Sequence, residues 1–199
     1  MECFLSSIEK SDVFVFTLGL TERWINKKHG FEYSICPGTT EGIYDESEHQ
    51  FENLDFPQVR KSLASALQKI KDRNKKIKVL LTVSPVPLVA TYENRHVLVS
   101  TMESKSTLRS VAGMLAKKRK YVDYFPSYEI INSFPFRGMF FEPNLRNVNH
   151  HGVNFVMQEF FSSLDPEGSA SKPTSKSKQG QTKKMDTVCE EELLEAFVK

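Results

Sequence analysis

The sequence predicts an α/β protein with a parallel sheet, because short apolar runs alternate with stretches of helical periodicity. The runs are "DVFVFTL" at residues 12–18, "IKVLLTV" at 77–83 and "YVDYF" at 121–125. Runs of this kind are typical of strands buried on both faces. Strands separated by helices imply parallel neighbours with right-handed crossovers. Three strands are few for such a sheet, so we expect a fold that is incomplete on its N-terminal side.

Three amphipathic helices are predicted between and after the strands. The first covers residues 57–73, and the second carries Leu108 to Leu115 and ends in "KKRK". The third runs to Leu164, with Asn149 as its cap. Residues 84–103 are predicted to be a loop with a short extended piece at "HVLVS".

Composition limits the classes of function. The chain has 199 residues, of which 39% are hydrophobic, and a net charge of +2, which argues against a nucleic-acid surface. Cys3, Cys36 and Cys189 are odd in number and show no metal-ligand spacing, so we expect no metal site and a reducing, cytoplasmic setting. We also expect no cofactor. We see no export signal and expect no membrane span.

The character of the chain changes at Asp165. Residues 165–185 hold a run with no large apolar side chain and several lysines, which predicts a disordered basic linker. Residues 186–199 are acidic and could form a short amphipathic helix or a frayed tail. The globular part is therefore expected to be residues 1–164.

Ligands of open α/β sheets bind outside the carboxyl ends of the strands, which selects the loops after each predicted strand. The loop around residues 144–147 would join them at the same rim. Polar or loop positions expected there are Gly19, Thr21, Glu22, Ser84, Thr91, Glu93, His96, Lys105, Arg109, Ser127, Tyr128, Glu129, Asn144 and Asn147.

Several of these residues have competing interpretations. Ser84 follows a strand as a nucleophile would, but Pro85 has no N–H for an oxyanion, which favours a turn serine. Glu22 and Glu129 could form an acid–base pair, or each could pair with an arginine. His96 could be a base or a surface residue.

Lys105 and Arg109 lie one helical turn apart in "SKSTLR". They could bind an anion near the start of the helix, or they could form the exposed cationic side of a capped helix. The sequence leaves the two interpretations open.

Six stretches occur in order along residues 10–164 and together closely resemble the GSCFA family, a bacterial group similar to the SGNH (GDSL-like) hydrolases. They are "VFTLGLTERW", "YSICPGTT", "LLTVSPVPLVAT", "STMESKSTLRSVAG", "VDYFPSYEII" and "MFFEPNLRNVNHHGVNFVMQEFF". The resemblance implies a flavodoxin-like, SGNH-like three-layer sandwich. It also implies acyl-ester hydrolase or acyltransferase chemistry in surface polysaccharide biosynthesis.

The chain departs from the family pattern in its catalytic motifs. It has no Gly-Ser-Cys-Phe-Ala block, so residues 1–164 are expected to match the C-terminal portion of the family domain. In the SGNH register Asn144 and Asn147 replace the aspartate and histidine, which removes the general base. Gly19 and Glu22 bound the block that would hold an asparagine oxyanion donor, and none is present.

Two hypotheses about function follow. The first is a hydrolase or acyltransferase that acts on an acyl-ester or glycan substrate through divergent residues. The alternative is a non-catalytic glycan-binding module, or a half-domain that associates with itself or with an N-terminal half-domain partner. The half-domain hypothesis predicts an exposed sheet edge and an exposed apolar face.

Overall fold

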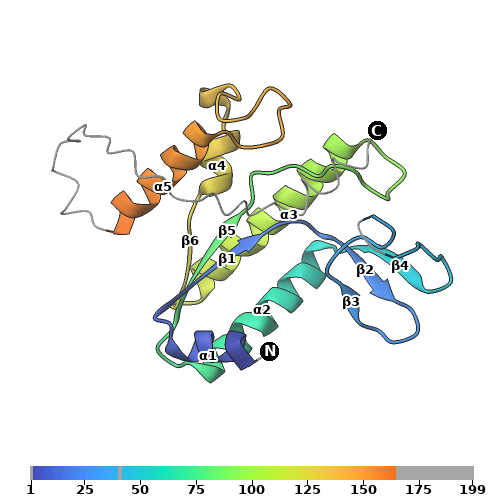
Figure 1. The fold of residues 1–199 in the computed structure, drawn as a ribbon. Coiled ribbons are helices and arrows are strands. Elements are labelled where there is room, and N and C mark those ends of the chain that lie inside the picture. The colour runs from blue at the N-terminus through green and yellow to red at the C-terminus, as the bar shows by residue number, and fades with distance from the viewer. Residues whose placement is uncertain (1, 40–41, 165–199) are drawn as a thin grey trace, which may run out of the picture.

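A parallel sheet forms the centre of the computed structural model, which describes residues 2–39 and 42–164 (Figure 1). Its strands lie in the order β1-β5-β6. Their bounds are Val13–Leu18 for β1, Lys78–Val83 for β5 and Val122–Tyr124 for β6. Val15 lies beside Leu80, and Leu80 lies beside Asp123. The predicted α/β class and the three predicted strands are confirmed.

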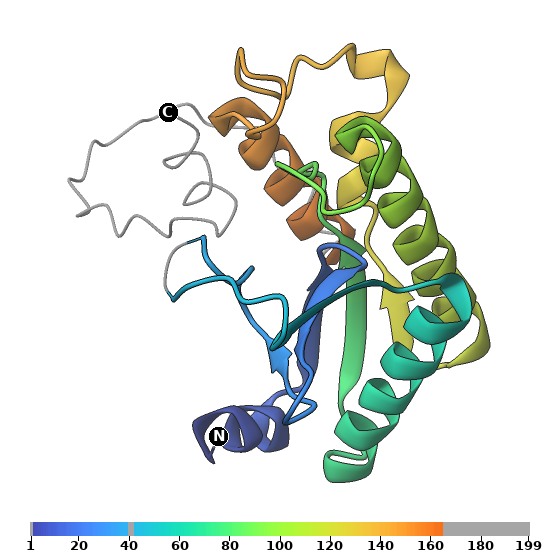
Figure 2. The ribbon, with the colours of Figure 1, turned by 90° about the vertical axis from the view of Figure 1, so that its right-hand side faces the viewer.

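Helices α2 (Phe56–Arg73) and α3 (Val97–Lys118) cover one face of this sheet (Figure 2). Val79, Leu81 and Val83 of β5 belong to the core on this face, and each is at most 1% exposed. The other core residues are Leu18, Val59, Leu63, Leu67, Leu108, Val111, Ala112, Leu115 and Val122. This single apolar cluster holds the strands and both helices together.

The opposite face is less covered, above all at β1. Val13 and Val15 are 54% and 50% exposed. Helix α5 (His150–Leu164) lies on this side, where the rings of Phe160 and Phe125 are 5.2 Å apart (Figure 2). The prediction that residues 12–18 are buried on both faces is therefore wrong, because β1 is an edge strand that the helix leaves exposed.

A small antiparallel sheet, absent from the sequence prediction, occupies the region between β1 and α2. Its order is β3-β2-β4, with bounds Glu22–Asn26 for β2, Glu32–Tyr33 for β3 and His49–Asn53 for β4. Trp24 lies in register with Tyr33 on one side and Phe51 on the other. The strands are short and mostly polar, so their aromatic pairs hold them together more than any apolar run does.

Local signals set the helix starts. Asp55 and Gln58 form a reciprocal capping box at the start of α2, which confirms the helix predicted at 57–73. Helix α3 begins at Val97, so the extended piece predicted at "HVLVS" is wrong. His96 caps this helix, because its Nδ1 accepts from the backbone N–H of Leu98 at 3.2 Å. The cap and the packing of the helix together outweigh the low helix propensity of the β-branched residues in its first turn.

The remaining helices are α1 (Glu2–Lys10), α4 (Ser127–Asn132) and the short η1 (Phe134–Phe136). Asn149 caps α5 as predicted, because its Oδ1 accepts from the N–H of Gly152 at 2.9 Å. A Cβ at Gly152 would lie 2.8 Å from the Cβ of Phe140, so only glycine lets α5 approach this segment.

The predictions for the linker at 165–185 and the acidic helix at 186–199 lie outside the described residues. In the part that the structure describes, no helix is long and apolar enough to cross a membrane.

Candidate functional site

The loop after β1 is anchored to α3 at the carboxyl end of the sheet. The ammonium of Lys105 donates to the carbonyl of Gly19 at 2.7 Å, and the N–H of Thr21 donates to Oγ of Ser104 at 2.9 Å. Lys105, Thr21 and Ser104 are all buried. These bonds fix the backbone that leads from β1 into β2, where the candidate Glu22 lies.

A hydrogen-bonded cluster gathers beside this loop, and we name its five residues, Thr21, Glu22, Asn53, Thr91 and Glu93, the carboxylate cluster. The hydroxyl of Thr21 donates to Oδ1 of Asn53 at 2.6 Å, and Nδ2 of Asn53 donates to Oε1 of Glu93 at 2.9 Å. The hydroxyl of Thr91 donates to Oε1 of Glu22 at 2.5 Å. Three separate segments of the chain therefore meet at one point.

The carboxyl of Glu22 is perturbed by its position in the cluster. Burial raises the pKa of Glu22 above its ordinary value, and the negative charge of Glu93 raises it further. The hydroxyl of Thr91 and the charge of Arg95 act in the opposite direction on this pKa. Arg95 also forms ion pairs with Glu93 and Glu103, which neutralise part of the local negative charge.

Aromatic side chains flank the carboxylate cluster. Tyr92, between Thr91 and Glu93 in the sequence, packs on Trp24 and Phe51 with centroid distances of 4.9 and 5.3 Å. The hydroxyls of Tyr92 and Tyr44 are 3.0 Å apart, and this bond raises the pKa of Tyr44 to about 12. Tyr92 is 57% exposed, so a ring and a hydroxyl face solvent beside the partly buried carboxylates of Glu22 and Glu93.

The candidate Glu129 belongs to a different group. It forms an ion pair with Arg109 and accepts from the hydroxyl of Tyr124 at 2.8 Å. Burial and this hydrogen bond raise the pKa of Tyr124, and burial with the charge of Glu129 raises that of Tyr128. Glu22 and Glu129 thus have separate partners, and the carboxylate that influences Glu22 is Glu93.

Lys105 and Arg109, the candidate anion-binding pair, are both engaged within the fold. Lys105 bonds the carbonyl of Gly19, and the guanidinium of Arg109 lies 4.0 Å from the ring centre of Tyr124. Arg109 also carries the ion pair with Glu129. Lys105 thus connects α3 to the loop after β1, and Arg109 connects α3 to β6 and α4.

The candidate hydroxyl nucleophile Ser84 lies in the turn after β5. Its Oγ accepts from the N–H of Val86 at 3.3 Å, and its own N–H donates to the carbonyl of Leu18. Ser127 is buried, with its Oγ 2.5 Å from the hydroxyl of Thr82 and 3.0 Å from the carbonyl of Val83. Both serines bond groups in their own surroundings, and the catalytic role of Ser84 and the place of Ser127 at the ligand rim stay predictions.

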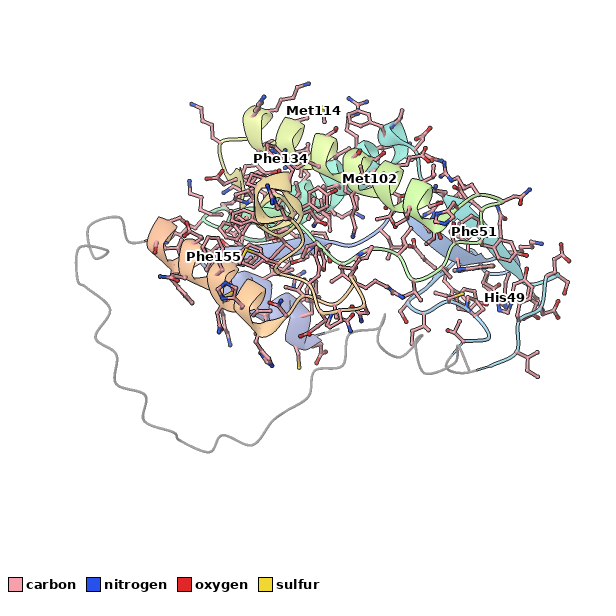
Figure 3. All side chains as sticks on the ribbon, turned by 90° about the horizontal axis from the view of Figure 1, so that it is seen from above. His49, Phe51, Met102, Met114, Phe134 and Phe155 are labelled. Atoms are coloured by element: carbon pink, nitrogen blue, oxygen red, sulfur yellow. The ribbon has the colours of Figure 1, made fainter. Side chains whose placement is uncertain are left out.

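Asn144 and Asn147 lie in the loop that precedes α5. Oδ1 of Asn144 accepts from the N–H groups of Arg146 and Asn147 at 2.9 and 3.0 Å. This side chain closes a turn in which Leu145 has a φ of 56°. Figure 3 shows Phe51, beside the carboxylate cluster, at the opposite end of the molecule from Phe155 of α5.

Sequence reasoning placed Thr21, Glu22, Thr91 and Glu93 at the rim but gave no role to the residues that join them. Asn53 was not identified as a member of the cluster, because the small sheet that carries it was not predicted. Tyr92 lay in a segment read as loop, although its setting between two polar rim residues was a usable signal. Among the described residues, no group of three His, Cys, Asp or Glu side chains could hold a metal ion.

The parallel sheet, its covering helices and the polar loops at the carboxyl ends of its strands define the chain as an α/β domain. The family model of the GSCFA family matches residues 1–160, and the chain belongs to this family. No curated protein matches the sequence.

Proposed function

We propose that the chain is a glycan-binding module of the GSCFA family that recognises acylated polysaccharide. The observation that carries this proposal is the exposed pair Tyr44 and Tyr92 beside the carboxylate cluster. A sugar ring offers an apolar C–H face and a circle of hydroxyls. Exposed aromatic rings beside carboxylate and amide groups complement both features.

The surroundings of the residues considered for ester hydrolysis favour binding over catalysis. Ser84 closes a turn, His96 caps α3 and Asn144 closes the loop before α5. Among residues 2–39 and 42–164, no serine hydroxyl is hydrogen-bonded to a histidine. A serine nucleophile needs a base within hydrogen-bond reach.

A second candidate function, acyl-ester hydrolysis or acyl transfer, is favoured by one observation. The raised pKa of Glu22 beside Glu93 is the kind of perturbation that suits a carboxyl to proton transfer. In this version the Glu22 carboxylate takes a proton from the water that attacks the acyl carbonyl, and it returns this proton to the sugar oxygen as the bond between that oxygen and the acyl carbon breaks.

Isothermal titration calorimetry with O-acetylated xylohexaose and its deacetylated form tests the binding proposal. Removing the ring in Tyr92→Ala should weaken binding by about 10-fold or more, while Tyr92→Phe should retain most of it. Phe134→Ala is the matched control, because this ring is 91% exposed and belongs to η1. Equal losses in Tyr92→Ala and Phe134→Ala, or no binding by the wild-type chain, would contradict the proposal.

Turnover of p-nitrophenyl acetate separates the two candidate functions. The binding module should release nitrophenol no faster than buffer and should not react with a serine-directed phosphonate. Turnover that Glu22→Gln abolishes would establish the second candidate instead. Turnover that Ser84→Ala abolishes would restore the serine mechanism.

We also propose a reducing, cytoplasmic setting for the protein. The sequence holds three cysteines, an odd number without metal-ligand spacing, which supports this proposal. Expression with and without an oxidising environment, followed by mass spectrometry of the thiols, tests it.

A further inference from the structure

Strand β1 is a sheet edge without protection. It is the terminal strand of the order β1-β5-β6, and within the described residues no strand pairs with its outer side. An edge strand directs the N–H and C=O groups of alternate residues outward, where another strand can pair with them. Val13–Leu18 therefore offers a six-residue template.

The two edges of the sheet differ in the features that block pairing. Strand β6, the other edge, has three residues, and one of them is the exposed Asp123. Strand β1 reads "VFVFTL" and has no charge, no proline and no glycine. Natural proteins protect edges with short strands, charges or proline, and β1 has none of these.

The side chains of β1 are also exposed on both sides of the strand. Val13 and Val15, which share one face, are 54% and 50% exposed, and Phe16 on the other face is 40% exposed. The ring of Phe16 stacks on Phe14 with centroids 5.9 Å apart. An apolar strand exposed in this way is a pairing surface for another polypeptide.

We propose that β1 pairs antiparallel with β1 of a second copy of this chain, about a two-fold axis at Val15. In a symmetric antiparallel contact the numbers of any two opposed residues add to the same total. Opposed residues must also point to the same face of the sheet. Centring on Val15 meets this rule and keeps the whole strand in the ladder. Val15 then opposes Val15, Phe14 opposes Phe16, and Val13 opposes Thr17.

The chemistry of the strand favours a copy of itself as the partner. The Phe14–Phe16 pairs of the two copies would join their stacked rings into one aromatic cluster on the helix-covered side. Asp12, the nearest charge, would oppose Leu18, so the ladder brings no like charges together. The result is a continuous sheet of six strands across the two copies, three from each.

Sedimentation equilibrium of the full chain tests the pairing through charge. The wild-type chain should dimerise. Val15→Lys or Val15→Glu alone should weaken the dimer by about 10-fold or more, because two like charges meet at the axis. An equimolar mixture of the two variants should dimerise again, since the introduced ammonium then opposes the introduced carboxylate.

Val153→Lys is the matched control, because Val153 is 46% exposed on α5 and lies outside the proposed contact. It should leave the dimer unchanged. A monomeric wild-type chain, equal weakening by Val153→Lys, or failure of the mixture to recover would each overturn the proposal. Far-ultraviolet circular dichroism of each variant reports whether it has folded.

Cysteine cross-linking tests the register. In a background with Cys3, Cys36 and Cys189 changed to serine, Val15→Cys should form an interchain disulfide, because opposed antiparallel Cα atoms lie about 4.5–5.5 Å apart. Val13→Cys should not, since its opposite residue is Thr17 and the two introduced thiols would be roughly 13 Å apart. Faster cross-linking of Val13→Cys would contradict this register.

Discussion

The two faces of the parallel sheet are built from the same strands but differ in what covers them. On one face Val79, Leu81 and Val83 are at most 1% exposed beneath α2 and α3. On the other, Val13 and Val15 are about half exposed, and α5 offers Val153 and Met157 to solvent. Burial, and with it stability, is concentrated on the first face, while the second can accept a partner.

The difference follows from where the helices of the described residues lie. Helices α2 and α3 pack against each other and against the same core cluster, so each supports the other. Helix α5 is held through its contacts with α4 and through ring contacts of Phe155 and Phe160 with the segments beside it, and none of its large apolar side chains belongs to the core cluster. We therefore expect substitutions on the two faces to differ in their effect on the free energy of unfolding.

A matched pair of valine substitutions gives the largest expected contrast. Val83→Ala should lower the free energy of unfolding by about 2–3 kcal/mol, because Val83 is 0% exposed and its removal leaves a cavity. Val153→Ala, at a position 46% exposed, should change it by less than about 0.5 kcal/mol. Urea denaturation measures both, and similar losses would show that the two faces are equally buried in solution.

A pair of glycine substitutions compares the packing of α5 with that of α3. Gly152→Ala should destabilise the protein by about 2 kcal/mol, because its Cβ would lie 2.9 Å from the backbone oxygen of Phe140. At Gly113 a Cβ would meet only the end of the Arg109 side chain, which can rotate away at the cost of its ion pair with Glu129, so Gly113→Ala should cost less than Gly152→Ala. A harmless Gly152→Ala in thermal unfolding would show that α5 can shift away from Phe140.

The covered face was largely predictable from the residue pattern, whereas an exposed sheet edge followed only from the half-domain hypothesis and not from the pattern of the strand. Long apolar runs identified β1 and β5, and helical periodicity identified α2. That β1 is an edge could not be read from "VFVFTL", because exposure depends on which helices reach it and not on the strand's own residues. The small sheet was missed because β2, β3 and β4 have five, two and five residues and little alternation.

The candidate site was half predictable for a similar reason. Topology alone placed Glu22, Thr91 and Glu93 at the ends of strands, since loops of parallel strands share one rim. Their partners came from elements that the sequence did not reveal, such as Asn53 of β4. Ser104 gave only the weak signal of a small residue on the buried stripe of α3.

The capping box of α2 tests how firmly the covered face is held at its edge. Asp55→Ala should lower the free energy of unfolding by about 1 kcal/mol, because the N–H of Gln58 loses its acceptor. Asp72→Ala near the end of the same helix is the control, since its exposed contact with Lys75 contributes little. Equal effects of the two substitutions would show that the cap is not formed in solution.

The smallest expected effect is the dependence of stability on pH that Glu22 produces at the start of β2. Because burial raises its pKa, protonated Glu22 favours folding, and that contribution is lost as pH rises from the unfolded pKa through the folded one. Relative to the wild type, Glu22→Gln should therefore gain stability between pH 4 and pH 7. Urea denaturation at both pH values measures this gain.

Thr91→Val removes the hydroxyl that lowers the pKa of Glu22, so it should move the loss of stability to higher pH. A difference between Glu22→Gln and wild type that stays constant with pH would mean that Glu22 is solvated like an ordinary surface carboxyl.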